Sequence, residues 1–207
     1  MKNSRVLEML EQNRLEELIA ELRDEIFTES LKTKPNAKKR YAAMKRYLKT
    51  ISESRPILTK PCEVKFANKK YNSFTNTYTV VLTTETCGEL EMCDDPDRYP
   101  DVTRLIHFDG NKSKIDICKV LAEAKSKGYK YTKTGIYKND YLMKYNDAYF
   151  RMALVDITYS VLDNGEEITV FYKGEHQPLT ISNDIGVGMI MPIRFTDDIG
   201  DVVIAEA

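Results

Sequence analysis

The feature that most constrains the fold is an apolar run near the C-terminal end, at residues 186–195. It reads Gly-Val-Gly-Met-Ile-Met-Pro-Ile-Arg-Phe. Glycines followed by branched and sulfur-containing side chains predict a buried strand that is entered through a tight turn. Pro192 has no N–H to offer a central strand, so it belongs on an edge strand or at a bulge, and the pattern suggests an apolar edge strand. Such an apolar edge, with Arg194 beside it, is a candidate docking surface; an ordinary terminal strand whose proline faces solvent explains the same residues.

The composition indicates a globular protein and excludes a generally basic nucleic-acid binder. The chain has 207 residues, of which 42% are hydrophobic and 30% charged, and its net charge is −1. This length accommodates one or two domains. Any contact with nucleic acid would therefore depend on local clusters of charge. No apolar run reaches the length of a membrane span, so we expect a cytoplasmic protein without membrane contact.

No combination of residues predicts a metal site, a cofactor or catalysis. The four cysteines are scattered without a Cys-x-x-Cys pair, and the only histidines are His107 and His176. This distribution argues against zinc and favours reduced thiols. Neither histidine accompanies a nucleophile pattern, and Gly-Val-Gly at 186–188 lacks the third glycine of a phosphate-binding loop. We therefore expect a protein that is not an enzyme.

The first part of the chain predicts an amphipathic helix over residues 4–27. One side is rich in glutamate, and the apolar side chains recur mostly at spacings of three and four, at Val6, Leu7, Leu10, Leu15, Leu18, Ile19, Leu22 and Ile26. Such a helix could pack on the body of the protein, pair with another copy of the chain, or bind a partner.

A strongly basic segment follows. Residues 30–52 contain eight basic residues and no acidic one, and a second helix is expected from about residue 36 to residue 51. Most of its cations lie away from its apolar stripe, so Lys38, Lys39, Lys45, Arg46 and Lys49 could neutralise DNA phosphates without reading base sequence. A solvated face balanced by the preceding acidic helix is the alternative.

The rest of the chain alternates between strand and helix patterns. Strands are predicted at 62–67, 76–84, 89–93, 167–172, 178–182 and 187–195, with two more around Gly135. Helices are predicted at about 114–127 and from Asn146 or Asp147 to about Val161. An extended connector at 98–106 leads into a short strand. The order predicts an α+β fold of antiparallel sheets backed by helices, with a repeated internal pattern.

Two segments resemble parts of bacterial DNA sliding clamps, the β subunit of the replicative DNA polymerase. Tyr-Pro-Asp-Val-Thr-Arg-Leu-Ile at 99–106 resembles the connector between the second and third clamp domains, and residues 189–195 resemble the closing strand. The resemblance implies clamp-like repeats with an extra N-terminal helix. It divides the chain into an N-terminal extension (1–33), a clamp-like half domain with the basic helix (34–108), and a C-terminal clamp-like domain with an acidic tail (109–207).

The chain is shorter than a three-domain clamp, which indicates a truncated or degenerate clamp of a phage or mobile element. The resemblance implies a processivity scaffold that binds duplex DNA non-specifically, docks linear motifs of polymerase or other replication proteins, and forms a homo-oligomer. Its peptide pocket would comprise Tyr99, Pro100, Arg104, Leu105, Met189, Ile190, Met191, Pro192, Ile193 and Arg194. Its DNA contacts would be the five cations of the basic helix together with Lys114, Lys119 and Lys125.

Two alternatives stay open beside the scaffold. A clamp-derived interaction module or decoy would bind the same peptides without DNA and without a ring. A host-defence or regulatory protein would take its partner through the N-terminal helix.

Overall fold

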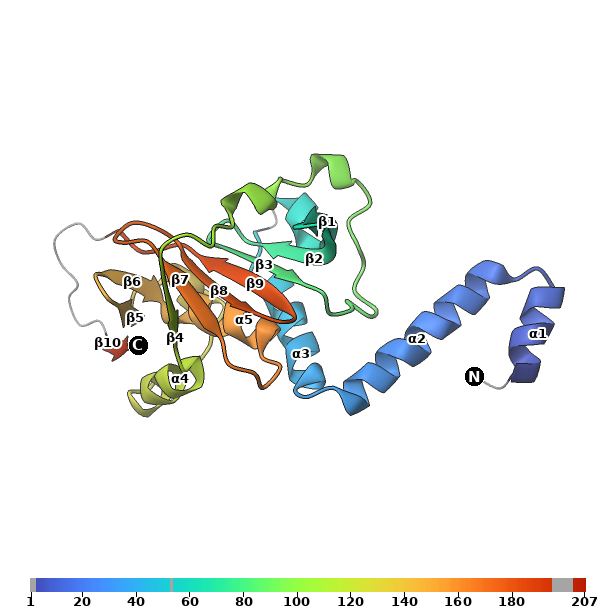
Figure 1. Ribbon diagram of the computed structural model, residues 1–207, viewed down its shortest axis with the longest axis horizontal. Coiled ribbons are helices and arrows are strands. Elements are labelled where there is room, and N and C mark those ends of the chain that lie inside the picture. The colour runs from blue at the N-terminus through green and yellow to red at the C-terminus, as the bar shows by residue number, and fades with distance from the viewer. Residues whose placement is uncertain (1–2, 53, 195–202) are drawn as a thin grey trace.

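The computed structural model describes residues 3–52, 54–194 and 203–207. Its body is built on one antiparallel sheet of seven strands, and a helical arm extends away from the body (Figure 1). From edge to edge the sheet comprises β1 (Cys62–Phe66), β2 (Lys69–Thr75), β3 (Thr79–Thr83), β9 (Gly186–Ile190), β8 (Leu179–Asn183), β7 (Thr169–Tyr172) and β4 (Asn111–Lys114).

A smaller sheet of three strands lies beside the large one and shares its core. The strands β5 (Tyr141–Tyr145) and β6 (Ala148–Arg151) form a hairpin, and β10 (Val203–Glu206) pairs with β5 in parallel. The α+β class of antiparallel sheets backed by helices is confirmed, with this one parallel pair. The large sheet joins strands on both sides of residue 108, and the proposed division into three segments stays a prediction.

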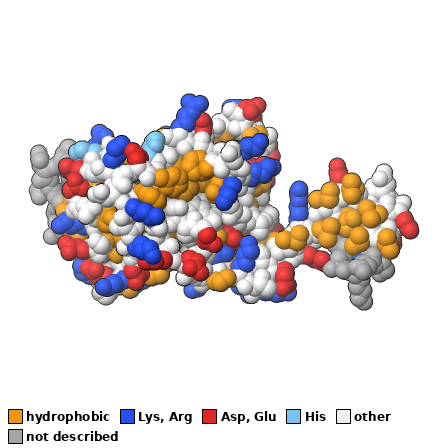
Figure 2. Space-filling view, in the orientation of Figure 1, with side chains coloured by type: hydrophobic (Ala, Val, Ile, Leu, Met, Phe, Trp, Pro, Cys, Tyr) orange, Lys and Arg blue, Asp and Glu red, His pale blue; other side chains and the backbone are white. Residues whose placement is uncertain are grey.

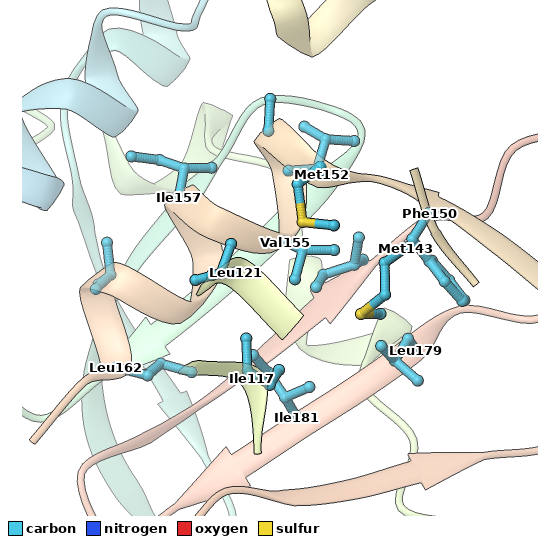
Figure 3. Packing of buried hydrophobic residues seen from close by; sticks show 14 of the residues in the cluster. Ile117, Leu121, Met143, Phe150, Met152, Val155, Ile157, Leu162, Leu179 and Ile181 are labelled. Atoms are coloured by element: carbon cyan, nitrogen blue, oxygen red, sulfur yellow. The ribbon is translucent and has the colours of Figure 1, made fainter. Parts of the chain in front are cut away.

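Three helices cover one face of the large sheet: α3 (Ala37–Leu48), α4 (Ile117–Ser126) and α5 (Met152–Leu162). The central one, α5, packs against both α3 and α4, and nine of its eleven residues are buried. Figure 3 shows its apolar side chains packed in one cluster with those of α4 and β8. Most of its buried residues are apolar, which is typical of a helix enclosed by a core.

Two glycines of β9 allow α5 to approach the sheet closely. A Cβ at Gly188 would lie 2.5 Å from Cγ2 of Thr158 on α5, and a Cβ at Gly186 would lie 2.8 Å from Cδ2 of Leu162 on the same helix. Both separations are too short for a side chain to be added without movement. The glycines, which suggested a tight turn, are therefore residues of the strand itself, and they are needed for packing.

The prediction that the closing strand lies at an edge is wrong. β9 is central, between β3 and β8, and it ends at Ile190, before Pro192. Beyond the strand, the Met191 N–H donates to the Tyr78 carbonyl at 2.9 Å and the Ile193 N–H donates to the Tyr149 carbonyl at 2.8 Å. Pro192 occupies the position between these two donors, so its missing N–H removes neither hydrogen bond.

Several predicted elements differ from the observed ones. Residues 89–93 form no strand. The connector, which in the structure comprises residues 96–106, is not extended but contains two short 3-10 helices, Pro96–Arg98 and Val102–Leu105. The helix expected from Asn146 begins at Met152, because Asn146 adopts a left-handed conformation (φ 51°) in the turn of the β5–β6 hairpin. Around Gly135 a short 3-10 helix replaces one of the two expected strands.

The N-terminal region forms two helices where one was predicted. α1 (Asn3–Glu11) and α2 (Leu15–Thr33) are separated by a turn in which Asn13 has a φ of 55°. Near the end of α2 the buried Phe27 ring packs edge-on against Tyr41 of α3, with 4.8 Å between ring centroids. Residues 3–26, which we call the arm, project from the body (Figure 1). Among the described residues, no helix has the length and apolarity needed to cross a membrane.

Candidate functional site

The connector, residues 96–106, packs on the face of the large sheet that is opposite α5. Val102 and Ile106 are buried there in a cluster with Val187 and Met189 of β9. The connector is anchored at its other end by Tyr99, which is buried and donates its hydroxyl to the Ser73 carbonyl at 3.1 Å. The two segments that drew attention in the sequence therefore lie against each other.

Strand register places three side chains in a row beneath the connector. Phe171 of β7 pairs with Thr180 of β8, which pairs with Met189 of β9. Paired residues on neighbouring strands share a face, so all three point to the connector side. The last pair of β8 and β9 is Leu179 with Ile190, so the next residues along the two strands, Pro178 and Met191, lie beside each other. Met191 is 38% exposed.

A hollow of about 150 Å³ lies where this row meets the end of the connector. We call it the connector cavity. Its residues are Leu105, His107, Asp109, Phe171, Lys173, Gln177, Pro178 and Thr180. Lys173 and Asp109 form an exposed ion pair at 2.6 Å, and hydrogen bonding to Lys173 lowers the pKa of Asp109. Figure 2 shows hydrophobic side chains gathered in the middle of this side of the body. Of the cavity residues, only Leu105 was assigned to the peptide pocket from the sequence. The fold brings the others to it.

The predicted peptide residues divide by exposure. Tyr99, Met189 and Ile190 are buried, and Ile190 faces the α5 core. The remaining ones are accessible: Leu105 and Met191 are partly exposed apolar side chains, Pro192 and Ile193 are half-buried, and Pro100, Arg104 and Arg194 are exposed. Arg104 forms an ion pair with Asp101 at 2.7 Å.

Most of the predicted DNA residues are exposed on the outer sides of α3 and α4. The exposed ones are Lys38, Lys39 and Lys45 of α3, Lys49 directly after it, Lys119 and Lys125 of α4, and Lys114 before α4. Lys114 pairs with Glu167. Arg46 is half-buried and stacks over the Tyr131 ring at 4.8 Å. A further cation of the same run, Arg40, is 2% exposed and forms a buried ion pair with Glu85 at 3.1 Å.

The basic surfaces of α3 and α4 are separated by acidic residues. A hollow of about 530 Å³ between the two helices is lined by several carboxylates next to Lys39: Asp116, Asp163, Glu166 and Glu167. The cations therefore form two patches and not one continuous stripe. This interruption weakens the attraction that either patch exerts on a phosphate backbone.

Comparison with solved structures agrees with this architecture. The crystal structure of the DNA polymerase sliding clamp from Bacillus subtilis is similar with a TM-score of 0.50 and 14% sequence identity, over 79% of this chain and 64% of the clamp chain. The chain has a sliding-clamp-like fold. The DNA polymerase III β subunit from Thermotoga maritima has a TM-score of 0.45 and 14% identity, over 79% of this chain and 65% of that chain.

The resemblance seen in the sequence is thus confirmed at the level of the fold. This clamp-like chain spans less than two thirds of the length of either subunit. No family model and no curated protein matches its sequence.

Proposed function

We propose that this protein is a non-enzymatic, clamp-like scaffold that docks linear peptides of replication proteins at the connector cavity and contacts duplex DNA through α3 and α4. The observation that carries the proposal is the packing of the connector onto β9, because it creates an apolar hollow with a polar rim on a sliding-clamp-like fold. The two activities rest on different surfaces, so each has its own test.

The connector cavity suits one large apolar side chain of an extended peptide. A volume of about 150 Å³ is enough to hold a single aromatic ring. Leu105, Phe171 and Pro178 supply apolar walls, and the flexible thioether of the neighbouring Met191 can adapt to the side chain that enters. The Asp109–Lys173 pair at the rim offers both signs of charge to the peptide backbone and to polar neighbours of the anchor residue.

Peptide selection tests this half of the proposal. Random peptides displayed on phage are selected on the purified protein, and the winners are measured by calorimetry. We expect sequences with a large apolar anchor, and at least about tenfold weaker binding to Leu105→Asp and Met191→Asp. Ile26→Asp replaces a still more exposed apolar side chain on the arm and should not change the affinity. Binders that tolerate both Leu105→Asp and Met191→Asp would refute this location.

The DNA half rests on the exposed lysines of α3 and α4. A rigid helix presents its lysines at fixed spacing, and each contact with a phosphate releases a condensed counterion. Arg40 is not expected to contact DNA, because its side chain is buried in an ion pair with Glu85. Affinity should consequently fall steeply with salt and show no preference for base sequence.

Fluorescence anisotropy on a labelled duplex, measured across a salt series, tests the DNA contact. Changing Lys38, Lys39 and Lys45 together to glutamate should remove binding at low salt. Lys65→Glu changes an exposed lysine of β1, at the far edge of the sheet, and should leave the salt slope as it was. If the unaltered protein does not bind the duplex at low salt, the proposed DNA contact is wrong, and the proposed peptide site is unaffected.

The acidic hollow between α3 and α4 favours the second candidate, an interaction module or decoy that binds peptides without DNA. Asp116, Asp163, Glu166 and Glu167 lie there between the two lysine patches. Peptide binding in the absence of any duplex affinity would select this module over the scaffold.

A further inference from the structure

The arm exposes more large apolar side chains than any other part of the described chain. Six of the eleven that are exposed lie on it: Leu7, Leu10, Leu15, Ile19, Leu22 and Ile26. The space-filling view shows them as a hydrophobic group on the arm, well separated from the body (Figure 2). An apolar group of this size on a projecting element is typical of an interaction surface.

The two helices of the arm use only one side of α2 for their mutual contact. Met9 of α1 and Leu18 of α2 are buried, at 3% and 4% exposure. Arg5 of α1 pairs with Glu21 of α2 at 2.7 Å, so the two helices run antiparallel. The arm is therefore a helical hairpin whose inner contact is already satisfied within the chain.

A second apolar stripe of α2 stays uncovered. Leu15, Ile19, Leu22 and Ile26, which we call the outer seam, follow one another at intervals of four, three and four residues. This is the spacing of a coiled-coil seam, with leucine and isoleucine alternating. The four side chains are 53%, 40%, 38% and 66% exposed.

The outer seam cannot be covered by its own body without breaking α2. The helix continues to Thr33, and Phe27, just beyond the seam, is buried against Tyr41 of α3. This anchor fixes the direction in which the arm leaves the body. None of the described residues covers the seam, so it is accessible to a partner from another chain.

We propose that the outer seam binds the outer seam of a second copy, in an antiparallel pair related by a two-fold axis. In that arrangement Ile19 lies opposite Leu22 of the other copy, and Leu15 lies opposite Ile26, so the pattern is self-complementary. A contact that is identical on both chains closes after two copies. Two paired hairpins would form a four-helix bundle, with α1 of each copy on the flank.

The charges beside the seam favour the antiparallel direction. Glu16 and Arg23 are exposed on the same flank of α2, and an antiparallel pair brings Glu16 of each copy to Arg23 of the other. A parallel pair would place the next seam position, Glu29, against its own copy, where like charges repel. The seam thus selects both a partner and its direction.

Sedimentation velocity over a range of concentrations tests the proposal. We expect a reversible monomer–dimer equilibrium in which Leu22→Glu raises the dissociation constant at least tenfold. Thr28→Glu adds the same charge on the opposite side of the same helix and should leave the equilibrium unchanged. A monomer at every concentration would overturn the proposal, as would a dimer that Leu22→Glu does not weaken.

Charge exchange tests the direction without altering the apolar residues. Arg23→Glu should weaken the dimer several-fold, because Glu16 of each copy would then face the new carboxylate at position 23 of the other. The double variant Glu16→Arg with Arg23→Glu should restore it. Failure of the double variant to restore the dimer would overturn the antiparallel arrangement. Helix content by circular dichroism is measured on every variant to show that the arm remains folded.

Discussion

Removing the carboxylate of Glu85 should destabilise the protein by about 3 kcal/mol, the lower end of the cost of breaking a buried ion pair. Glu85 binds Arg40 at 3.1 Å, and both side chains are at most 9% exposed. In Glu85→Ala the guanidinium would remain buried with only the carbonyls of Pro35 and Asp163 as acceptors. Lys34, half exposed, also pairs with Glu85, and losing that contact should add less than about 1 kcal/mol.

Urea unfolding followed by circular dichroism measures this loss. In a protein of this size it corresponds to a fall of roughly 6–12 °C in Tm. The double variant Arg40→Met with Glu85→Leu removes both charges at once, so it should be less destabilised than Glu85→Ala alone, although two carbonyls lose a donor. A loss below about 1 kcal/mol in Glu85→Ala, or no recovery in the double variant, would refute the assignment of Arg40 to the interior.

Three further results are expected. Gly188→Ala should cost about 1–3 kcal/mol in the free energy of unfolding because of its contact with Thr158, and Thr158→Ser, which removes the opposing methyl group, should recover part of it. Burial raises the pKa of Cys87 to about 12; its stabilising contribution is present below the unfolded thiol pKa of about 8.5 and is lost as pH rises. Above that pH the unfolding free energy of the unaltered protein should therefore fall more steeply than that of Cys87→Ala, by about 1.4 kcal/mol per pH unit. Equal slopes for the two proteins would contradict the burial of Cys87. Iodoacetamide should label the exposed Cys118 rapidly, whereas labelling of Cys87 should require unfolding, as mass spectrometry of the peptides will show.

Local patterns predicted several elements correctly. The cores of α3 and α4 follow from apolar residues at helical spacing, and β9 follows from its branched residues. The start of α5 was missed because Asn146 and Asp147 suit a helix cap and a hairpin turn equally well. Which of the two forms is decided by the pairing of β5 with β6, and sequence spacing does not show that pairing.

Long-range contacts account for the remaining differences. Arg40 appears in the sequence as one more cation of a basic run, because its partner Glu85 lies 45 residues away. Pro192 suggested an edge strand, but strand pairing ends two residues before it. The candidate site shows the same division: the connector and closing segment are visible as motifs, whereas Phe171 and Thr180 join them only through strand register.

The central position of β9 has a consequence for synthesis on the ribosome. The Thr83 hydroxyl at the end of β3 binds the Ile185 carbonyl, which lies 102 residues later in the chain. At a translation rate of roughly 5–20 residues per second, β3 would wait on the order of 5–20 s for its neighbour. Every residue of β3 is buried in the finished sheet. During that interval the nascent chain therefore exposes an unpaired strand edge that can pair with other chains. Completion of the sheet, and with it the connector cavity, is therefore expected only after nearly the whole chain has emerged.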